Sequence, residues 1–107
     1  MTTIGFVGAG NMGEALIRGL VGGRVVRPAD IWVSEPDKTR RASLIKGYRV
    51  RAAADNADLV RRCAVIVLAV KPQLMPAVLA AIAPAAGRAK LVVSIAAGVL
   101  LVLMLVV

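Results

Sequence analysis

The spacing of glycines near the N-terminus constrains the fold of this 107-residue chain more than any other feature. Gly8, Gly10 and Gly13 form a G-x-G-x-x-G pattern directly after the apolar run 4–7 and directly before a segment with helical spacing. In such a strand–turn–helix unit, the first glycine permits the tight turn, the second lets a diphosphate approach the backbone, and the third lets helix and strand pack closely. The pattern therefore predicts a dinucleotide-binding loop. The alternative interpretation is a glycine-rich turn that holds no ligand.

Strand-like and helix-like segments alternate along the chain. Apolar runs, most of them rich in β-branched residues, predict strands at 4–7, 31–34, around 50, 64–70 and 91–95. Between them, helical spacing or helix-start residues predict helices at 11–21, 36–46, 55–62 and after residue 72. This alternation predicts right-handed crossovers and a parallel sheet with helices on both faces. We therefore expect a single α/β domain over residues 1–98, a Rossmann-type doubly wound parallel sheet.

The first helix is the most closely specified of these segments. Its sheet-facing side is expected to consist of Met12, Ala15, Leu16, Gly19 and Leu20. Asn11 is the expected N-cap, and Glu14 stands four residues before Arg18, in the order that favours an ion pair. Glycines are expected to end the first two helices, at Gly22-Gly23 and at Gly47.

Composition excludes several kinds of chemistry. The chain has no His and one Cys, so we expect no His-based catalytic triad, no metal site of the zinc type and no internal disulfide. A net charge of +8 raises the question of nucleic acid, but only 3% of residues are aromatic and the basic residues are scattered. No basic segment precedes an apolar one at the N-terminus, so a secretory signal is not expected. These features favour a cytoplasmic protein that binds no nucleic acid.

The residue at the end of the second strand decides between NAD and NADP. If that residue is Ser34, its small hydroxyl leaves room for a 2′-phosphate. The positive charge for the phosphate would then come from Lys38, Arg40 or Arg41, although a basic cluster of this kind also fits a solvated helix face. If the residue is Glu35, its carboxylate would repel the phosphate and favour NAD. We predict NADP as the cofactor.

Three segments occur in a diagnostic order along the chain. Residues 4–13 carry the glycine pattern, residues 69–73 read A-V-K-P-Q after the fourth strand, and residues 93–99 read V-S-I-A-A-G-V after the fifth. Together they resemble the signatures of pyrroline-5-carboxylate reductase, the enzyme family of the last step of proline biosynthesis, and they cover essentially residues 3–99. The resemblance implies an oxidoreductase that transfers a hydride from a reduced nicotinamide to the imine carbon of 1-pyrroline-5-carboxylate.

The resemblance also implies a set of cofactor contacts. It assigns the phosphate loop to Phe6, Val7, Gly8, Ala9, Gly10, Asn11, Met12 and Gly13. It assigns the adenosine ribose or its phosphate to Ser34, and a further nucleotide contact to Asn56. It assigns the approach to the nicotinamide and the flank of its pocket to Ala69, Val70, Lys71, Pro72, Ser94, Ile95, Ala96 and Ala97. No catalytic side chain is identified in the chain.

Two features depart from the family. The family continues into an all-helical domain that builds the oligomer and the substrate pocket, so we expect this chain to bind cofactor but to take a pyrroline carboxylate only with a second domain. Residues 99–107 are apolar where the family begins an amphipathic helix, and we expect an atypical tail that is too short to span a bilayer. The alternatives are a non-catalytic or regulatory nucleotide-binding module from a truncated gene, a deazaflavin reductase and a 3-hydroxyacid dehydrogenase of the same fold.

Overall fold

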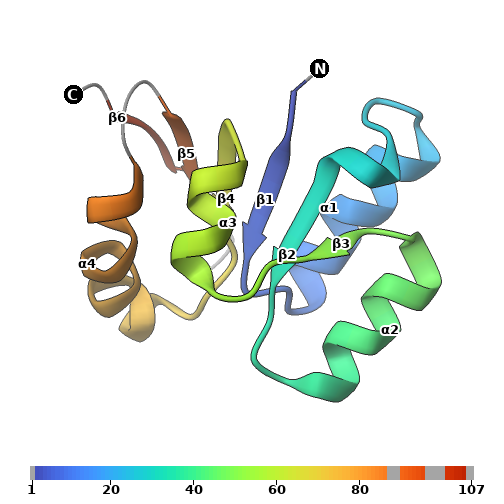
Figure 1. The fold of residues 1–107 in the computed structure, drawn as a ribbon, viewed down its shortest axis with the longest axis horizontal. Helices are drawn as coiled ribbons and strands as arrows, with labels where there is room; N and C mark the ends of the chain where they lie inside the picture. The colour runs from blue at the N-terminus through green and yellow to red at the C-terminus, as the bar shows by residue number, and fades with distance from the viewer. Residues whose placement is uncertain (1, 87–89, 96–100, 106–107) are drawn as a thin grey trace.

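A mixed sheet of six strands lies between two layers of helices in the computed structural model, which describes residues 2–86, 90–95 and 101–105 (Figure 1). The strands are β1 (Ile4–Val7), β2 (Ile31–Ser34), β3 (Arg51–Ala52), β4 (Val65–Leu68), β5 (Lys90–Ser94) and β6 (Leu101–Leu105). The helices are α1 (Asn11–Gly22), α2 (Lys38–Tyr48), α3 (Asn56–Arg62) and α4 (Met75–Ala86), with 3-10 turns η1 (Pro28–Asp30) and η2 (Pro72–Leu74). The predicted alternation of strands and helices is confirmed.

The strand order is β3-β2-β1-β4-β5-β6, and the strands from β1 to β5 are parallel to one another. The chain therefore moves outward from β1 in one direction and then returns to continue in the other, which places the change of direction between β1 and β4. The register aligns Val7 with Ser34 and Leu68, and Leu68 with Ser94. The segments that follow β1, β2, β4 and β5 consequently leave the sheet at one edge, where ligands of such sheets bind.

Two hydrophobic cores cover the two faces of the sheet. Phe6 belongs to the core beneath α1 and α2, and its neighbour Val7 to the core beneath α3 and α4, because successive strand residues point to opposite faces. Ile17 of α1 and Ile82 of α4 are buried in these respective cores. Figure 1 shows the two helix pairs on opposite sides of the strands. The doubly wound α/β prediction is confirmed.

The predicted sheet-facing side of α1 is wrong in part. Gly13 and Ile17 are the buried residues of this helix, whereas Met12 is 48% and Leu16 40% exposed. The physical reason is that Gly13 has no side chain and lets α1 approach the end of β4, so the side of the helix that carries it turns toward the sheet. A count of apolar residues does not detect this, because glycine adds no hydrophobicity.

The end of α2 also differs from the prediction. The helix continues through Gly47 to Tyr48 and ends where Arg49 adopts a left-handed backbone conformation, with φ of 61°. Tyr48 is bound to α1, because its hydroxyl donates a hydrogen bond to Glu14 Oε2 at 2.8 Å. The same carboxylate forms the predicted ion pair with Arg18 at 3.4 Å. These tertiary contacts extend the helix beyond the glycine that was expected to end it.

The strand β6 was not predicted, and it makes the sheet mixed. It pairs antiparallel with β5, with Ser94 opposite Leu101 and Lys90 opposite Leu105. A parallel neighbour would need a crossover of about a dozen residues or more, whereas the chain between these two strands is far shorter.

Among the helices that the structure describes, none is both long and apolar enough to cross a membrane.

Two glycines offer a matched test of this packing. A Cβ on Gly5 of β1 would lie 2.8 Å from Leu59 Cγ and 2.9 Å from Cys63 Sγ, on α3 and its C-cap, whereas a Cβ on Gly19 of α1 would meet no atom within 4 Å. We expect Gly5→Ala to lower the free energy of unfolding by about 1–3 kcal/mol through overpacking. Gly19→Ala should raise it by roughly 0.5–1 kcal/mol, because alanine favours a helix interior. Urea denaturation measures both, and equal effects of the two substitutions would contradict the packing described here.

A second test uses the pH dependence of stability at the start of α3. The backbone N–H of Ala54, above all, and the guanidinium of Arg62 donate to Asp58, and they hold the pKa of its carboxyl below its ordinary value of 3.8. The charged form therefore stabilises the fold above pH 3.8, and this contribution is lost as pH falls through the lowered pKa. Asp58→Asn should cost more stability at pH 7 than at pH 3 in urea denaturation. An equal cost at both values would contradict this role of the charge.

Candidate functional site

The turn from β1 into α1 requires the first glycine of the pattern. Gly8 adopts a φ of +72°, a conformation that side chains disfavour, and its N–H donates to Ser34 O at 2.9 Å. A Cβ at this position would also lie 3.0 Å from Val70 Cγ1 and 3.1 Å from Ala69 O. The positive φ fits the tight turn that the pattern predicted, and the turn is also packed tightly against the segment that follows β4.

The second and third glycines have different surroundings. A Cβ on Gly10 would meet no atom within 4 Å, so the backbone there is bordered by open space on the side of its missing side chain. A Cβ on Gly13 would lie 3.3 Å from the Cβ of Ala69 and 3.6 Å from Gly8 O. Gly10 therefore leaves room above the backbone, and Gly13 brings α1 close to the strand end. These are the two physical tasks that the spacing indicated.

The N-terminus of α1 has no side-chain cap within the described part of the chain. The N-cap is Gly10, and no side chain accepts a hydrogen bond there. Asn11, the predicted cap, is instead the first residue of the helix, because the extended backbone of Gly10 already forms the entry and its carbonyl accepts from Glu14 N at 2.9 Å. A helix normally satisfies its first N–H groups with a side chain or an anion. This N-terminus is therefore suited to an anionic group such as a diphosphate.

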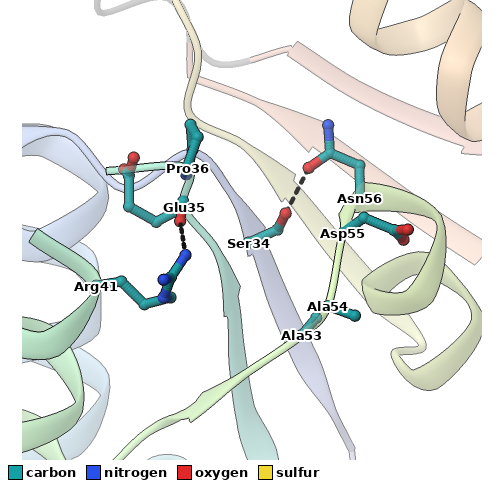
Figure 2. A pocket seen from close by; sticks show the side chains of 8 residues that line it. All are labelled: Ser34, Glu35, Pro36, Arg41, Ala53, Ala54, Asp55 and Asn56. Carbon is teal, nitrogen blue, oxygen red and sulfur yellow. Dashed lines mark hydrogen bonds between the residues drawn. The ribbon is translucent and has the colours of Figure 1, made fainter. Parts of the chain in front are cut away.

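A cavity of about 260 Å³ lies beside the end of β2. Its walls include Ser34 and Arg41 on one side and the loop Ala53–Asn56 on the other (Figure 2). The hydroxyl of Ser34, which is 6% exposed, donates to Asn56 Oδ1 at 2.6 Å. The two residues predicted to contact the nucleotide here, Ser34 and Asn56, thus lie together, although they are 22 residues apart in the chain.

The structure separates the basic residues that the sequence could not distinguish. Arg41 lines the cavity, and its Nη1 donates to the carbonyl of Glu35 at 2.9 Å. Arg40 donates instead to Ala9 O in the glycine loop at 2.8 Å, and Lys38 is exposed at the start of α2. β2 ends at Ser34, so Ser34 is the residue at the end of the second strand and Glu35 is the first residue after it.

The carboxylate of Glu35 is already engaged by backbone. Its Oε1 accepts from Ala9 N at 3.2 Å and its Oε2 from Asp37 N at 3.0 Å. Figure 2 shows this carboxylate pointing away from Asn56. The contacts of Glu35 and Arg40 with Ala9 were not foreseen in the sequence, because they join residues that are 26 and 31 positions apart.

Residues after β4 and β5 complete the same edge of the sheet. Ala69 donates its N–H to Val7 O at 2.9 Å and touches the glycine loop, whereas Lys71 and Pro72 are exposed at the start of η2. Ser94 and Ile95 are buried at the end of β5. The predicted Ala96 and Ala97 lie outside the described residues.

Several predicted contacts can present only backbone to a ligand. The side chains of Phe6, Val7 and Ala9 are almost completely buried in the two cores, so a nucleotide can meet these residues at their peptide groups alone. Asn11 and Met12 are exposed at the start of α1. The cavity residues Ala53, Ala54 and Asp55 were not predicted. The available signal was a run of small residues before the Asp55 cap of α3.

Three known proteins that are similar to this chain in sequence or in fold carry the names of oxidoreductases. A pyrroline-5-carboxylate reductase of Synechocystis is 43% identical over 96 residues, which cover 90% of this chain and 36% of that protein. The crystal structure of the Plasmodium falciparum pyrroline carboxylate reductase with NADP bound aligns with a TM-score of 0.74 at 31% identity, over 89% of this chain and 33% of the other. A Mycobacterium tuberculosis 3-hydroxyisobutyrate dehydrogenase aligns with a TM-score of 0.74 at 25% identity, over 90% of this chain and 32% of the other.

These findings confirm the resemblance to pyrroline-5-carboxylate reductase that the three sequence segments indicated. The chain spans about a third of the length of the relatives it matches. Residues 3–98, almost the whole chain, match the family described as NADP oxidoreductase, coenzyme F420-dependent. The protein therefore belongs to this NADP oxidoreductase family.

Proposed function

We propose that the chain forms the NADPH-binding part of a pyrroline-5-carboxylate reductase, which reduces 1-pyrroline-5-carboxylate to proline. The observation that carries the proposal is the uncapped N-terminus of α1 next to the open side of Gly10, because both features suit the diphosphate of a dinucleotide. The identities to reductases of this name support the choice of reaction.

The residues at the site fit such a cofactor. The glycine loop offers backbone N–H groups for the diphosphate, and the cavity between Ser34 and Asn56 offers polar groups for the adenosine ribose. Arg41 at the cavity wall brings a permanent positive charge, which suits a 2′-phosphate and favours NADP over NAD. When bound, NADPH supplies the hydride for the reaction.

The residues after β4 and β5 would orient the nicotinamide. Ala69 and Val70 hold the turn at Gly8, and Ser94 and Ile95 are buried at the adjacent strand end. With Lys71 and Pro72 at the start of η2, these residues form the edge along which the cofactor would extend from the loop. Their role is to bind and to position, and the proposal assigns no proton transfer to them.

The wider proposal concerns the rest of the enzyme. Residues 1–98 would form the cofactor-binding unit, and 99–107, which include β6, a short addition to it. The substrate carboxylate would be bound by a second domain, since the matched relatives are about three times as long as this chain. As in the family, a cytoplasmic homo-oligomer is proposed for the complete enzyme.

The first test is a titration of the purified chain with NADPH, followed by nicotinamide fluorescence. We expect saturable binding, and we expect Gly10→Val to weaken it at least tenfold because the added side chain fills the space that the diphosphate needs. The same substitution should lower the free energy of unfolding by no more than about 1 kcal/mol, because nothing lies within 4 Å of that side of the residue and only the preference for glycine at the N-cap is lost. Addition of 1-pyrroline-5-carboxylate then tests whether the chain catalyses the reaction. Unchanged binding in the variant would contradict the proposed site.

The second test concerns the choice between NADPH and NADH. Arg41→Ala should weaken NADPH binding by about tenfold to a hundredfold, since a charge-assisted contact is worth roughly 1.5–3 kcal/mol, and should leave NADH binding almost unchanged. Lys46→Ala is the matched control, because it removes an equal charge from an exposed position in the last turn of the same helix. The ratio of the two dissociation constants measures the effect. Equal weakening of NADH by the Arg41 variant would refute a role in reading the 2′-phosphate.

A further inference from the structure

Two charged side chains contact the backbone of a single residue in the glycine loop. Ala9 stands between Gly8 and Gly10, its N–H donates to Glu35 Oε1 at 3.2 Å, and its carbonyl accepts from Arg40 Nη1 at 2.8 Å. Both contacts are partly buried; Glu35 lies in the segment between β2 and α2, and Arg40 lies in the first turn of α2. The acceptor and the donor of this one residue are therefore satisfied by side chains of opposite charge.

The two side chains are themselves connected. Glu35 Oε2 accepts from Asp37 N at 3.0 Å, and Asp37 Oδ1 accepts from Arg40 N at 3.0 Å as the N-cap of α2. The four hydrogen bonds form a closed path from Ala9 through Glu35, Asp37 and Arg40 back to Ala9. We call this path the Ala9 clamp. Because these hydrogen bonds already fix the side chains of Glu35 and Arg40, neither side chain has to change its conformation when a ligand binds.

The loop needs such a constraint because of the residues on either side. Gly8 and Gly10 can adopt many backbone conformations, so the two peptide groups of Ala9 could rotate if only the buried Ala9 side chain held them. One of these peptide groups carries the Ala9 N–H and the other carries the Ala9 carbonyl together with the Gly10 N–H. The clamp grips both groups, and it thereby fixes the backbone that leads into the N-terminus of α1.

We propose that Glu35 and Arg40 are positioning residues, which hold the peptide groups of Ala9 in the orientation that receives the diphosphate. The proposal rests on the proposed function, because it concerns the same cofactor loop. It assigns Arg40 a role different from that of Arg41. A residue that fixes the loop must affect NADPH and NADH alike, since the diphosphate is common to both, whereas a residue that contacts the 2′-phosphate affects NADPH alone.

The experiment combines two measurements on the full chain. Amide hydrogen exchange of Ala9 and Gly10, followed by NMR without nucleotide, reports on the clamp itself. Titration with NADPH and with NADH reports on its consequence. The variants are Arg40→Ala, Glu35→Ala and Glu35→Gln, and Lys46→Ala serves as control because Lys46 is an exposed cation in the last turn of the same helix. Urea denaturation confirms that each variant is folded.

We expect faster exchange of the Ala9 amide in Glu35→Ala and weaker binding of both nucleotides, each by about tenfold, in Glu35→Ala and Arg40→Ala. Their NADPH-to-NADH ratio should stay at the wild-type value. Glu35→Gln, which keeps an oxygen that can accept from Ala9, should recover part of the affinity and of the protection. Lys46→Ala should match the wild type.

Each other outcome overturns a stated part of the argument. If wild-type protein binds both nucleotides but Glu35→Ala and Arg40→Ala bind them equally well, the positioning role is wrong and the proposed function stands. If Arg40→Ala weakens NADPH alone, Arg40 contacts the phosphate and is no positioning residue. If the wild-type chain binds neither nucleotide, the proposed function fails and the positioning role fails with it, whatever the exchange rates show.

Discussion

The close approach of α1 to the end of β4 is the constraint on which the rest of the site depends. A side chain on Gly13 would lie 3.3 Å from the Cβ of Ala69, so the helix can reach this position only because the residue has none. The approach turns Ile17 into the core and brings the helix N-terminus beside the strand ends. If α1 were displaced outward, the positive end of its dipole would leave the edge of the sheet where the cofactor would lie.

The sequence was sufficient for the features that depend on local pattern. The parallel strands and the glycine turn follow from apolar runs and from a spacing in which each glycine has its own steric task. The orientation of α1 could not be read in this way, because Gly13 decides it through packing and not through hydrophobicity. The bond from Ser34 to Asn56 and the contacts of Ala9 could not be read either, since they join positions that only the folded sheet brings together. Likewise, pairing of β6 with β5 depends on an edge that exists only after the sheet has formed.

The excess of basic residues has a local explanation in the site. Arg40 and Arg41 both donate to backbone carbonyls, of Ala9 and Glu35 respectively, and an arginine used in this way needs no acidic partner. Two guanidinium groups are therefore held near the end of β2 without neutralisation by those contacts. Positive charge so placed favours a ligand with several phosphates, and part of the net charge of +8 thus suits a nucleotide and need not indicate nucleic acid.

In the proposed cofactor site, backbone and side chains would divide the recognition of the cofactor between them. The diphosphate would be met by peptide groups whose geometry follows from three glycines and a helix start, so this part can stay constant while surrounding residues change. The distinction between cofactors would fall to side chains of the segment from Ser34 to Arg41, and the substrate to residues elsewhere. This chain aligns equally well with a pyrroline carboxylate reductase and with a 3-hydroxyisobutyrate dehydrogenase, both at a TM-score of 0.74. The fold is therefore common to proteins whose names differ in substrate, and the choice of substrate depends on residues that the fold does not dictate.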